Sequence, residues 1–588
     1  MFKNSFYDSK KSTIHIWEQI NGEDLYDSFQ WVPYVFIKSI GERVNAKTID
    51  DAPVMKKDFY TYQDYYDFQQ NNFCYENKVK PEIQFLAERY YNIPDEDVKV
   101  PSLREYFIDI EVLSNKGFPD PKKAIDPITI ISFHDSKLQK TISFGIKEYN
   151  GNKENIEFHT CNSEQDLLKK FFLYMYRNPC DILSGWNIWN FDLPYIINRS
   201  NILFKTSPHV LMSPIKSVKT WKQKNSDEIS IDISGVCILD YYSIYKWYSP
   251  NKLENYQLGY VSEVELGEGK LDYSEYKDLN DLYNRNWNLY VEYNIIDCRR
   301  VYQLERKLGY IKLIQSQSLL TKTPMRYNNE MTQLIEGAML VYFRRNNLCA
   351  PTFMGGTQET FEAAYVKEPQ KGMHNWVTSV DITSSYPSHI ITLNMSVETY
   401  IGRIMGLKEN YIINCVKSRE FQKFDMFKEN SGIVKMEGQK LKNFNKVLKK
   451  GLVAIAPCGS IFSTSKQGVI SEVERNVFFK RKEVKGLMSK MRLQASQMHE
   501  GKEKEKVLER AQELFSFQWA LKIWLNAVFG AMAVPYSRYF NTNIAEAITS
   551  CGRNTIKSGE RFINEFLNNP DTELKKIISE IEIWVKIL

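Results

Sequence analysis

Hydrophobic and polar positions follow a distinctive order in the middle of the chain. From Arg104 onward, apolar runs of strand length, at residues 106–114, 128–136 and 181–189, are separated by stretches of helical character. Short apolar runs between polar segments are typical of buried strands, and their alternation with helices is typical of an α/β domain. We therefore predict a sheet built from these runs.

The segments on either side of this region have other patterns. The first hundred residues are aromatic-rich, with strand-like runs at 13–17 and 31–37. A strand is also predicted at 377–382, where a second mixed region opens. Residues 474–529 have the period of a helix, broken near Gly501, and predict an antiparallel helical hairpin. At roughly 150 residues per domain, a chain of 588 residues is expected to be a multidomain α+β protein.

Composition narrows the class of protein. Hydrophobic residues make up 43% of the chain and charged residues 25%, which is typical of a folded globular protein and excludes a disordered or collagen-like chain. The net charge is only +5, so a nucleic-acid surface requires local clustering of basic residues. Nine cysteines stand singly without a CxxC pair, which indicates reduced thiols in a cytosolic protein. We expect no membrane span, because no uninterrupted apolar run reaches about 18 residues.

Two acidic residues interrupt the first apolar strand. Asp109 and Glu111 are two positions apart, so both side chains leave the same face of the strand. Neighbouring buried carboxylates repel each other unless a cation joins them, which indicates a divalent metal site. An edge strand with solvated acids is the alternative interpretation.

Later residues extend this acidic set. Asp192 stands at a predicted helix start, and Tyr293 and Asp297 are spaced i, i+4 on one helical face. Either segment alone is also typical of a helix cap or a surface helix. Together with the strand pair, the four carboxylates and the tyrosine can hold two Mg²⁺ ions about 3.5–4 Å apart and orient a water for attack on a phosphodiester.

The exonuclease motifs of family B DNA polymerases resemble these three segments, which read FIDIE, GWNIWNFDLPYI and YNIID. The segment GFPDP, at 117–121, resembles sequences of the T-even bacteriophage branch of that family. The resemblance implies a ribonuclease-H-like 3′→5′ exonuclease domain that removes mispaired 3′ nucleotides. It also implies a role for each residue, with Tyr293 positioning the water and the metal ligands being Asp109, Glu111, Asp192 and Asp297.

A second group of segments resembles the polymerase motifs of the same family. The segment SVDITSSYPSHI is similar to motif A, which implies that Asp381 and the backbone carbonyl of Ile382 bind metal. It further implies that Ser384, Ser385 and Tyr386 lie at the nucleotide, with Tyr386 as the steric gate against a ribose 2′-hydroxyl. The family usually has Leu at the position of Ser385, a change that bears on packing beneath the nucleotide.

The predicted helical hairpin carries the remaining resemblance. FFKRKEVKG is similar to the fingers segment that holds the triphosphate, which implies contacts from Arg481 and Lys485. ALKIWLNAVFGAM is similar to motif B, which implies that Lys522 and Asn526 bind the nucleotide, with Phe529 where the family usually has Tyr. A solvated basic helix is the alternative interpretation of this lysine-rich run.

Motif C of the family, an Asp-Thr-Asp hairpin that supplies the second palm carboxylate, is missing from the sequence. One carboxylate cannot hold two metals for nucleotide addition. We therefore expect a separate C-terminal chain to provide motif C, the thumb and the sliding-clamp contact. The resemblance also implies Mg²⁺ as cofactor, two ions per site with Mn²⁺ able to substitute. The implied substrates are dNTPs, primer–template DNA and single-stranded 3′ ends, in the cytoplasm of an infected bacterium.

The motifs also divide the chain into parts. The expected parts are an N-terminal domain at 1–103 and 310–352, the exonuclease domain at 104–309, an incomplete palm at 353–467 and 535–588, and helical fingers at 468–534. A Lys-rich stretch at 435–450 matches none of the motifs, and no role is assigned to it.

Three functions are compatible with the sequence. The first is the N-terminal portion of a split viral replicative DNA polymerase with a proofreading exonuclease. The second is a stand-alone 3′→5′ DNA exonuclease with a vestigial polymerase half. The third is a non-catalytic nucleic-acid-binding protein, which the complete set of exonuclease ligands disfavours. The first two require that the four exonuclease carboxylates meet in the folded protein.

Overall fold

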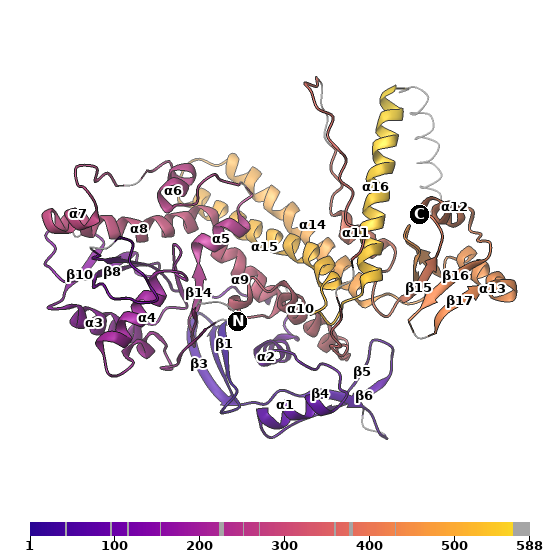
Figure 1. The fold of residues 1–588 in the computed structure, drawn as a ribbon, viewed down its shortest axis with the longest axis horizontal. Helices are drawn as coiled ribbons and strands as arrows, with labels where there is room; N and C mark the ends of the chain where they lie inside the picture. The colour runs from indigo at the N-terminus through magenta and orange to yellow at the C-terminus, as the bar shows by residue number, and fades with distance from the viewer. Residues whose placement is uncertain are drawn as a thin grey trace.

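The computed structural model describes residues 1–568 apart from a few short stretches, namely 42–43, 95–96, 115–116, 153, 223–228, 251, 270, 358–359, 376–379 and 430. Figure 1 shows an elongated molecule, with residues from about 105 to 300 at one end and a small lobe of residues 400–463 at the other. Helices and strands both contribute throughout, so the predicted multidomain α+β class is confirmed. Within the described ranges, no helix is long and apolar enough to cross a membrane.

The N-terminal region contains small antiparallel sheets, β1–β2–β3 and β4–β6–β5, and helices α1 and α2. Their bounds are β1 Phe2–Asp8, β2 Thr13–Ile20, β3 Glu23–Gln30, β4 Val35–Lys38, β5 Ala46–Lys47, β6 Pro53–Lys57, α1 Tyr62–Asn71 and α2 Pro81–Tyr90. The strand predicted at 13–17 is confirmed within β2. The one predicted at 31–37 is strand only from Val35, because Pro33 has no N–H to donate to a ladder.

The next region is built on a mixed sheet in the order β10–β9–β8–β7–β11–β14. The strands from β7 to β9 are antiparallel, whereas β11 and β14 run parallel to β7. The strands are β7 Glu105–Val112, β8 Ile128–Asp135, β9 Lys140–Gly145, β10 Ile156–Thr160, β11 Ile182–Gly185, β14 Cys237–Asp240 and the separate hairpin β12 Val218–Lys222 with β13 Ile229–Ile233. The three apolar runs predicted as strands are confirmed as β7, β8 and β11.

Helices cover both faces of this sheet. Those of the region are α3 Glu164–Arg177, α4 Asp192–Leu203, the 3₁₀ turn η2 Pro208–Met212, α5 Tyr241–Tyr248, α6 Leu258–Leu266, α7 Leu279–Arg285 and α8 Trp287–Leu308. Ile108, Ile110 and Phe133 pack with Phe171 of α3 and Ile196 of α4 on one face. The other face is crossed by α8, whose contacts are with β7 and β8. Both faces of the sheet are therefore covered by helices, as an α/β packing requires.

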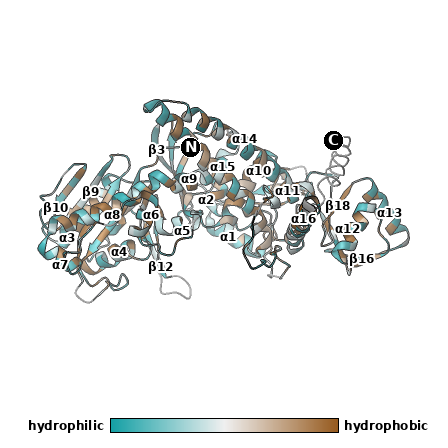
Figure 2. Ribbon diagram, turned by 90° about the horizontal axis from the view of Figure 1, so that it is seen from above, coloured by the Kyte–Doolittle hydropathy of each residue, from teal (hydrophilic) through white to brown (hydrophobic). Residues whose placement is uncertain are grey.

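The remaining elements form a helical centre and the small lobe. The central elements are α9 Tyr310–Thr321, η3 Met325–Tyr327, α10 Met331–Arg345, α11 Ser385–Thr392, α14 Val469–Ser496, α15 Lys502–Ala533 and α16 Thr542–Asn568. The lobe holds β15 Tyr400–Met405, α12 Glu409–Ser418, β16 Phe424–Lys428, β17 Gly432–Met436, α13 Gly438–Lys449, β18 Val453–Ile455 and β19 Ser460–Ser463. The helical hairpin predicted around Gly501 is confirmed as α14 and α15, which pack along each other. Figure 2 shows hydrophilic as well as hydrophobic residues on both helices, as expected for a hairpin with one packed face.

The strand predicted at 377–382 is wrong for the part that the structure describes. Residues 376–379 lie outside the described residues, and Val380, Asp381 and Ile382 form no strand. A strand needs a partner elsewhere in the chain, and none of the described strands is hydrogen-bonded to this segment. Asp381 is therefore exposed, just ahead of α11.

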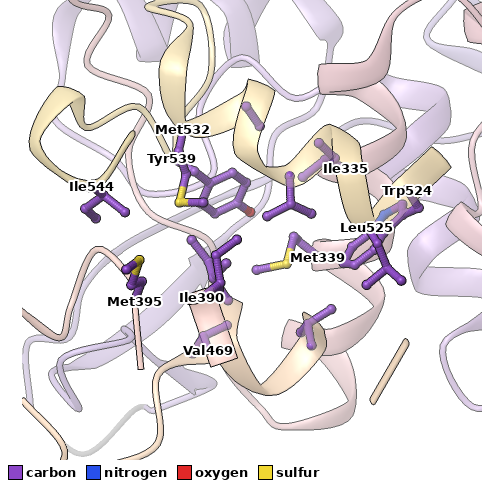
Figure 3. Packing of buried hydrophobic residues seen from close by; sticks show 14 of the residues in the cluster. Ile335, Met339, Ile390, Met395, Val469, Trp524, Leu525, Met532, Tyr539 and Ile544 are labelled. Carbon is purple, nitrogen blue, oxygen red and sulfur yellow. The ribbon is translucent and has the colours of Figure 1, made fainter. Parts of the chain in front are cut away.

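A shared core joins helices that are far apart in the sequence. Met339 of α10, Ile390 of α11, Val469 of α14, Leu525 of α15 and Ile544 of α16 pack into one cluster (Figure 3). Each is at most 7% exposed. Burying a large aliphatic side chain contributes about 1.5–3 kcal/mol, so this cluster holds the base of the hairpin on α10 and α11.

A buried arginine, Arg538, joins the N-terminal region to the helical centre. Arg538 is 3% exposed as a side chain, and its Nε lies 2.7 Å from Glu336 Oε1. The same guanidinium donates to the carbonyl oxygens of Pro351 and, at 2.9 Å, of Asn77. Every contact spans at least 187 residues of chain, so Arg538 joins segments that are remote in sequence.

Glu474 is an unusual member of the core. It lies on α14 with no exposed surface, and neither carboxyl oxygen has a hydrogen-bond partner among the described residues. Burial raises its pKa well above the usual value. The folded protein therefore favours the protonated form of this side chain.

Truncation of the helical core should destabilise the protein. We expect Leu525→Ala, at a side chain that is 1% exposed, to lower the free energy of unfolding by about 2–5 kcal/mol, because it removes buried methyl groups and leaves a cavity. The measurement is the urea midpoint of the unfolding transition. Leu508→Ala is the matched control, since Leu508 lies on the same helix but is 44% exposed, and an equal shift in both variants would contradict the assignment of the core.

The buried carboxyl of Glu474 predicts a pH-dependent effect. Because its pKa is raised in the folded protein, the unfolded chain loses this proton at lower pH, and the stability falls as the pH rises above about 4.5. The cost grows by about 1.4 kcal/mol per pH unit until the folded pKa is reached. Glu474→Gln should therefore raise the melting temperature relative to the native protein more at pH 8 than at pH 5. The exposed Glu483→Gln is the control, and a pH-independent difference for Glu474→Gln would contradict the prediction.

Candidate active sites

The first candidate site begins on β7, which is paired on both sides by β8 and β11. This excludes the alternative of a solvated edge strand. Asp109 and Glu111 leave the face of β7 opposite to Ile108 and Ile110, which pack into the core beneath α3 and α4. Glu111 is 9% exposed. The strand thus presents both carboxylates toward α8, as the spacing predicts.

Asp192 is held against β7 by a turn. It is the first residue of α4, is 3% exposed, and its Oδ1 accepts a hydrogen bond of 3.1 Å from the backbone N–H of Ile110. The turn before it passes very close to the sheet, since a Cβ on Gly185 would lie 2.5 Å from the carbonyl oxygen of Ile108. Glycine is therefore required at that position.

Helix α8 supplies the remaining residues of this site. Tyr293 and Asp297 lie one turn apart on it and are 7% and 9% exposed. Between them, Asn294 donates from Nδ2 to Oδ2 of Asp109 at 2.6 Å, which ties α8 to β7. Arg300 Nη1 lies 3.4 Å from Asp297 Oδ1 in an ion pair.

Burial and neighbouring negative charges raise the pKa values of the side chains in this site. Burial raises the pKa of Asp109 well above its usual value, and the charges of Asp192, Glu111 and Asp297 raise it further. Burial also raises the pKa of Asp192 to about 7, against the backbone hydrogen bonds that the carboxylate accepts. The pKa of the Tyr293 phenol is raised by burial and by Asp297, Glu111 and Asp109. The hydrogen bonds from Ile110 to Asp192 and from Asn294 to Asp109 hold α4 and α8 against β7, so the structure brings the five predicted residues to one place.

The donor set suits hard divalent cations. Carboxylate oxygens are the ligands that Mg²⁺ and Mn²⁺ prefer, and four of them meet here where water is largely excluded. Among the described residues, however, no group of three or more His, Cys, Asp or Glu side chains is arranged to hold a metal ion as it stands. The residue types fit the metals that the resemblance implies, but the described side chains are not arranged around a metal position.

Two neighbours of this site were not predicted from the sequence. Asn294 contacts Asp109 directly, and its spacing of three and four from Asp297 and Cys298 on α8 is the signal that places it on the same helical face. Asp240, at the end of β14, accepts a hydrogen bond of 2.8 Å from the backbone N–H of Asn187 and so shapes the turn before α4. A single sequence offers no comparable signal for Asp240.

The second candidate site lies around the start of α11. Ser384 has a φ of 54° and precedes the helix, which begins at Ser385. Arg481 on α14 donates from Nη1 to the Ser384 hydroxyl at 3.3 Å. The ring of Tyr386 lies 4.7 Å from that of Phe529 on α15. The structure thus brings the segment after Asp381 against both helices of the hairpin.

The other predicted residues of this site face solvent. Lys485 on α14 and Lys522 and Asn526 on α15 are exposed, and Lys522 Nζ lies 4.8 Å from the ring centroid of Trp519. Asp381 and Ile382 are exposed as well.

Comparisons with known proteins match two parts of the chain to one family. The model of "DNA polymerase family B, exonuclease domain" matches residues 48–261, and that of "DNA polymerase family B" matches residues 322–583. The chain is 28% identical over 531 residues to the DNA-directed DNA polymerase of Escherichia phage RB69, an alignment that covers 83% of this chain and 57% of that protein. For the polymerase of Enterobacteria phage T4 the identity is 28% over 504 residues, covering 78% and 55%.

A more distant relative extends the comparison beyond bacteriophages. The DNA polymerase catalytic subunit of Alcelaphine herpesvirus 1 is 24% identical over 499 residues, covering 82% of this chain and 43% of that protein. The chain thus spans little more than half the length of the phage relatives. Both domain types match over most of the sequence, and the chain belongs to DNA polymerase family B.

Proposed function

We propose that this chain is the exonuclease-bearing portion of a viral replicative DNA-directed DNA polymerase. The observation that carries the proposal is the convergence of Asp109, Glu111, Asp192 and Asp297 beside Tyr293. It is supported by the hydrogen bond from Ile110 of β7 to Asp192 and by that from Asn294 of α8 to Asp109. The substrates we propose are single-stranded 3′ DNA ends for the exonuclease and primer–template DNA with dNTPs for the polymerase. The phage relatives suggest the cytoplasm of an infected bacterium as the place of action.

The exonuclease reaction that we propose is metal-dependent hydrolysis. Family B polymerases and exonucleases depend in general on divalent metals, and here the four carboxylates would hold Mg²⁺, with Mn²⁺ as a substitute. Such ions, when bound, lower the pKa of a water ligand and neutralise charge on the phosphodiester oxygens. Asn294 orients Asp109, and Arg300 holds Asp297. Because the pKa of Tyr293 is raised, its hydroxyl keeps the proton and can donate a hydrogen bond to the attacking water.

The polymerase site that we propose consists of Asp381 and the Ile382 carbonyl for metal, with the nucleotide held by Ser384, Ser385, Tyr386, Arg481, Lys485, Lys522 and Asn526. The contacts of Arg481 with Ser384 and of Tyr386 with Phe529 support this grouping. Nucleotide addition needs a second palm carboxylate, and the sequence holds no Asp-Thr-Asp triplet. We propose that polypeptide outside these 588 residues, such as a separate C-terminal chain, supplies it with the thumb and the clamp contact.

A stand-alone 3′→5′ exonuclease is the second candidate. One observation favours it, namely that Asp381 is exposed and its segment is paired with none of the described strands. The two candidates differ only in whether primer extension can be obtained, so the experiments below separate them.

Loss of the β7 carboxylates should abolish trimming of single-stranded 3′ ends. We expect Asp109→Ala with Glu111→Ala to lower the rate with Mg²⁺ by a factor on the order of 1,000 or more, because both cation ligands on this strand are lost. Trimming by the native chain should also stop when EDTA is added and resume when Mg²⁺ or Mn²⁺ is supplied. The assay follows shortening of a 5′-labelled oligonucleotide, with the exposed pair Glu148→Ala and Glu154→Ala as control. Persistent trimming by the β7 variant, or none by the native chain, would refute the assigned site.

Primer extension should depend on Asp381 once the missing carboxylate is provided. We expect this chain, mixed with a polypeptide that carries the Asp-Thr-Asp hairpin and thumb of a related phage polymerase, to extend a primer. Asp381→Ala should abolish extension and leave 3′ trimming by the same chain intact, because the two sites are separate. A verified complex that never extends a primer would favour the stand-alone exonuclease.

A further inference from the structure

The lobe of residues 400–463 takes no part in the proposed catalysis. It lies at the end of the molecule opposite the exonuclease sheet (Figure 1). The lobe contains twelve Lys and Arg but five Asp and Glu, a net charge of +7, whereas the whole chain carries +5. The positive charge of the protein is therefore concentrated here, which is the local clustering that a polyanion-binding surface requires.

Within the lobe, the charge is gathered on one side of α13. The opposite side of this helix packs into the core of the lobe through Leu441, Phe444 and Leu448. At 100° per residue, the outward side carries four exposed lysines within an arc of about 100°. These residues, which we term the α13 lysine face, are Lys442, Lys446, Lys449 and Lys450.

The α13 lysine face is poorly neutralised by the protein itself. The ion pair found there among the described residues is Lys449 Nζ to Glu420 Oε2 at 3.5 Å, with both side chains more than half exposed. Such exposed pairs contribute about 0–1 kcal/mol. Like charges three and four positions apart on a helix repel each other. The face is therefore unfavourable in the isolated protein, and an anionic partner would relieve the repulsion.

The dimensions of the face match duplex DNA. From Lys442 to Lys450 the helix rises about 12 Å, and duplex DNA carries about one phosphate charge per 1.7 Å of axis, so about seven charges lie within reach. Proteins that bind single strands combine basic grooves with aromatic side chains on which bases stack. The aromatic residue of α13, Phe444, is turned into the core instead. The face therefore suits phosphate contacts without base stacking.

The lobe is also fixed rigidly to the part of the chain that holds Asp381. Arg403 of β15 forms a bidentate ion pair with Glu546 of α16, with Nη1 2.6 Å from Oε2 and Nη2 2.8 Å from Oε1. The Ser460 hydroxyl of β19 donates to the backbone oxygen of Asn543 at 3.0 Å. Because α11 packs on α16, a duplex bound to α13 would have a defined position relative to α11.

We infer that the α13 lysine face binds the phosphate backbone of duplex DNA without reading its sequence. The inference rests on the proposed function in so far as DNA is the substrate. It adds an anchoring point outside both candidate active sites that contributes to affinity and not to chemistry.

The test is the binding of a labelled 20-base-pair blunt duplex by the full chain in EDTA, which prevents trimming. Changing the four lysines to Gln should weaken binding at least tenfold at 100 mM salt, and the slope of log K against log salt should fall by about three to four. The matched control removes four lysines of the same lobe that lie off this face, as Lys408→Gln, Lys417→Gln, Lys423→Gln and Lys435→Gln. It should retain most of the affinity and most of the salt slope, and equal melting temperatures establish that both variants are folded.

The results that would overturn this inference differ from those that would overturn the proposed function. Unchanged affinity and salt slope in the α13 variant would overturn the inference, as would an equal loss in the control, since binding would then follow net charge alone. Loss of binding to anionic lipid vesicles or heparin, with duplex binding retained, would overturn it in favour of another polyanion. Trimming of single-stranded 3′ ends should be unaffected by the α13 variant. A chain that binds duplex through α13 yet trims nothing would contradict the exonuclease proposal only.

Discussion

Mutual repulsion among the acidic side chains on β7, α4 and α8 is the constraint on which the exonuclease region depends. Carboxylates do not gather in a partly dry space unless something holds them there. In this protein, neutral parts of the fold hold the acidic residues of β7 and α4 in place, and Arg300 forms an ion pair with Asp297 on α8. The far side of β7 is locked into an apolar layer, the turn at Gly185 admits no larger residue, and the amide of Asn294 ties α8 to Asp109. The scaffold thus holds the acidic side chains close together against their mutual repulsion.

The polymerase-like region follows a different design. Asp381 stands exposed and apart from the other acids, so no comparable repulsion has to be restrained. What surrounds it is a set of helices whose relative positions are set by one apolar cluster, in which Met339, Ile390 and Leu525 meet (Figure 3). This cluster lets side chains from α11, α14 and α15 approach each other across about 100 residues of sequence. Packing rather than electrostatics therefore organises this half of the protein.

Much of the fold could be predicted from the sequence where the signal is local. The strands β7, β8 and β11 and the hairpin around Gly501 have clear hydrophobic periods, and Asp109 and Glu111 stand within β7. The strand predicted before α11 is wrong over the described residues, because a strand is made by its partner and not by its own propensity. Asn294 was missed because its role depends on a contact with a residue 185 positions away. The roles given to the residues of both sites stay predictions, and Lys485, Lys522 and Asn526 face solvent.

The buried guanidinium of Arg538 has a consequence for the order in which the polypeptide is built. Its hydrogen bond to the carbonyl of Asn77 closes a loop of 461 residues. At a synthesis rate of about 5–20 residues per second, the early region waits roughly 25–90 s on the ribosome before this contact can form. During that interval the carbonyl group of Asn77, which later accepts a hydrogen bond from Arg538, must be hydrogen-bonded to water or protected by chaperones. Completion of the amino-terminal part is therefore a late event in the biogenesis of this protein.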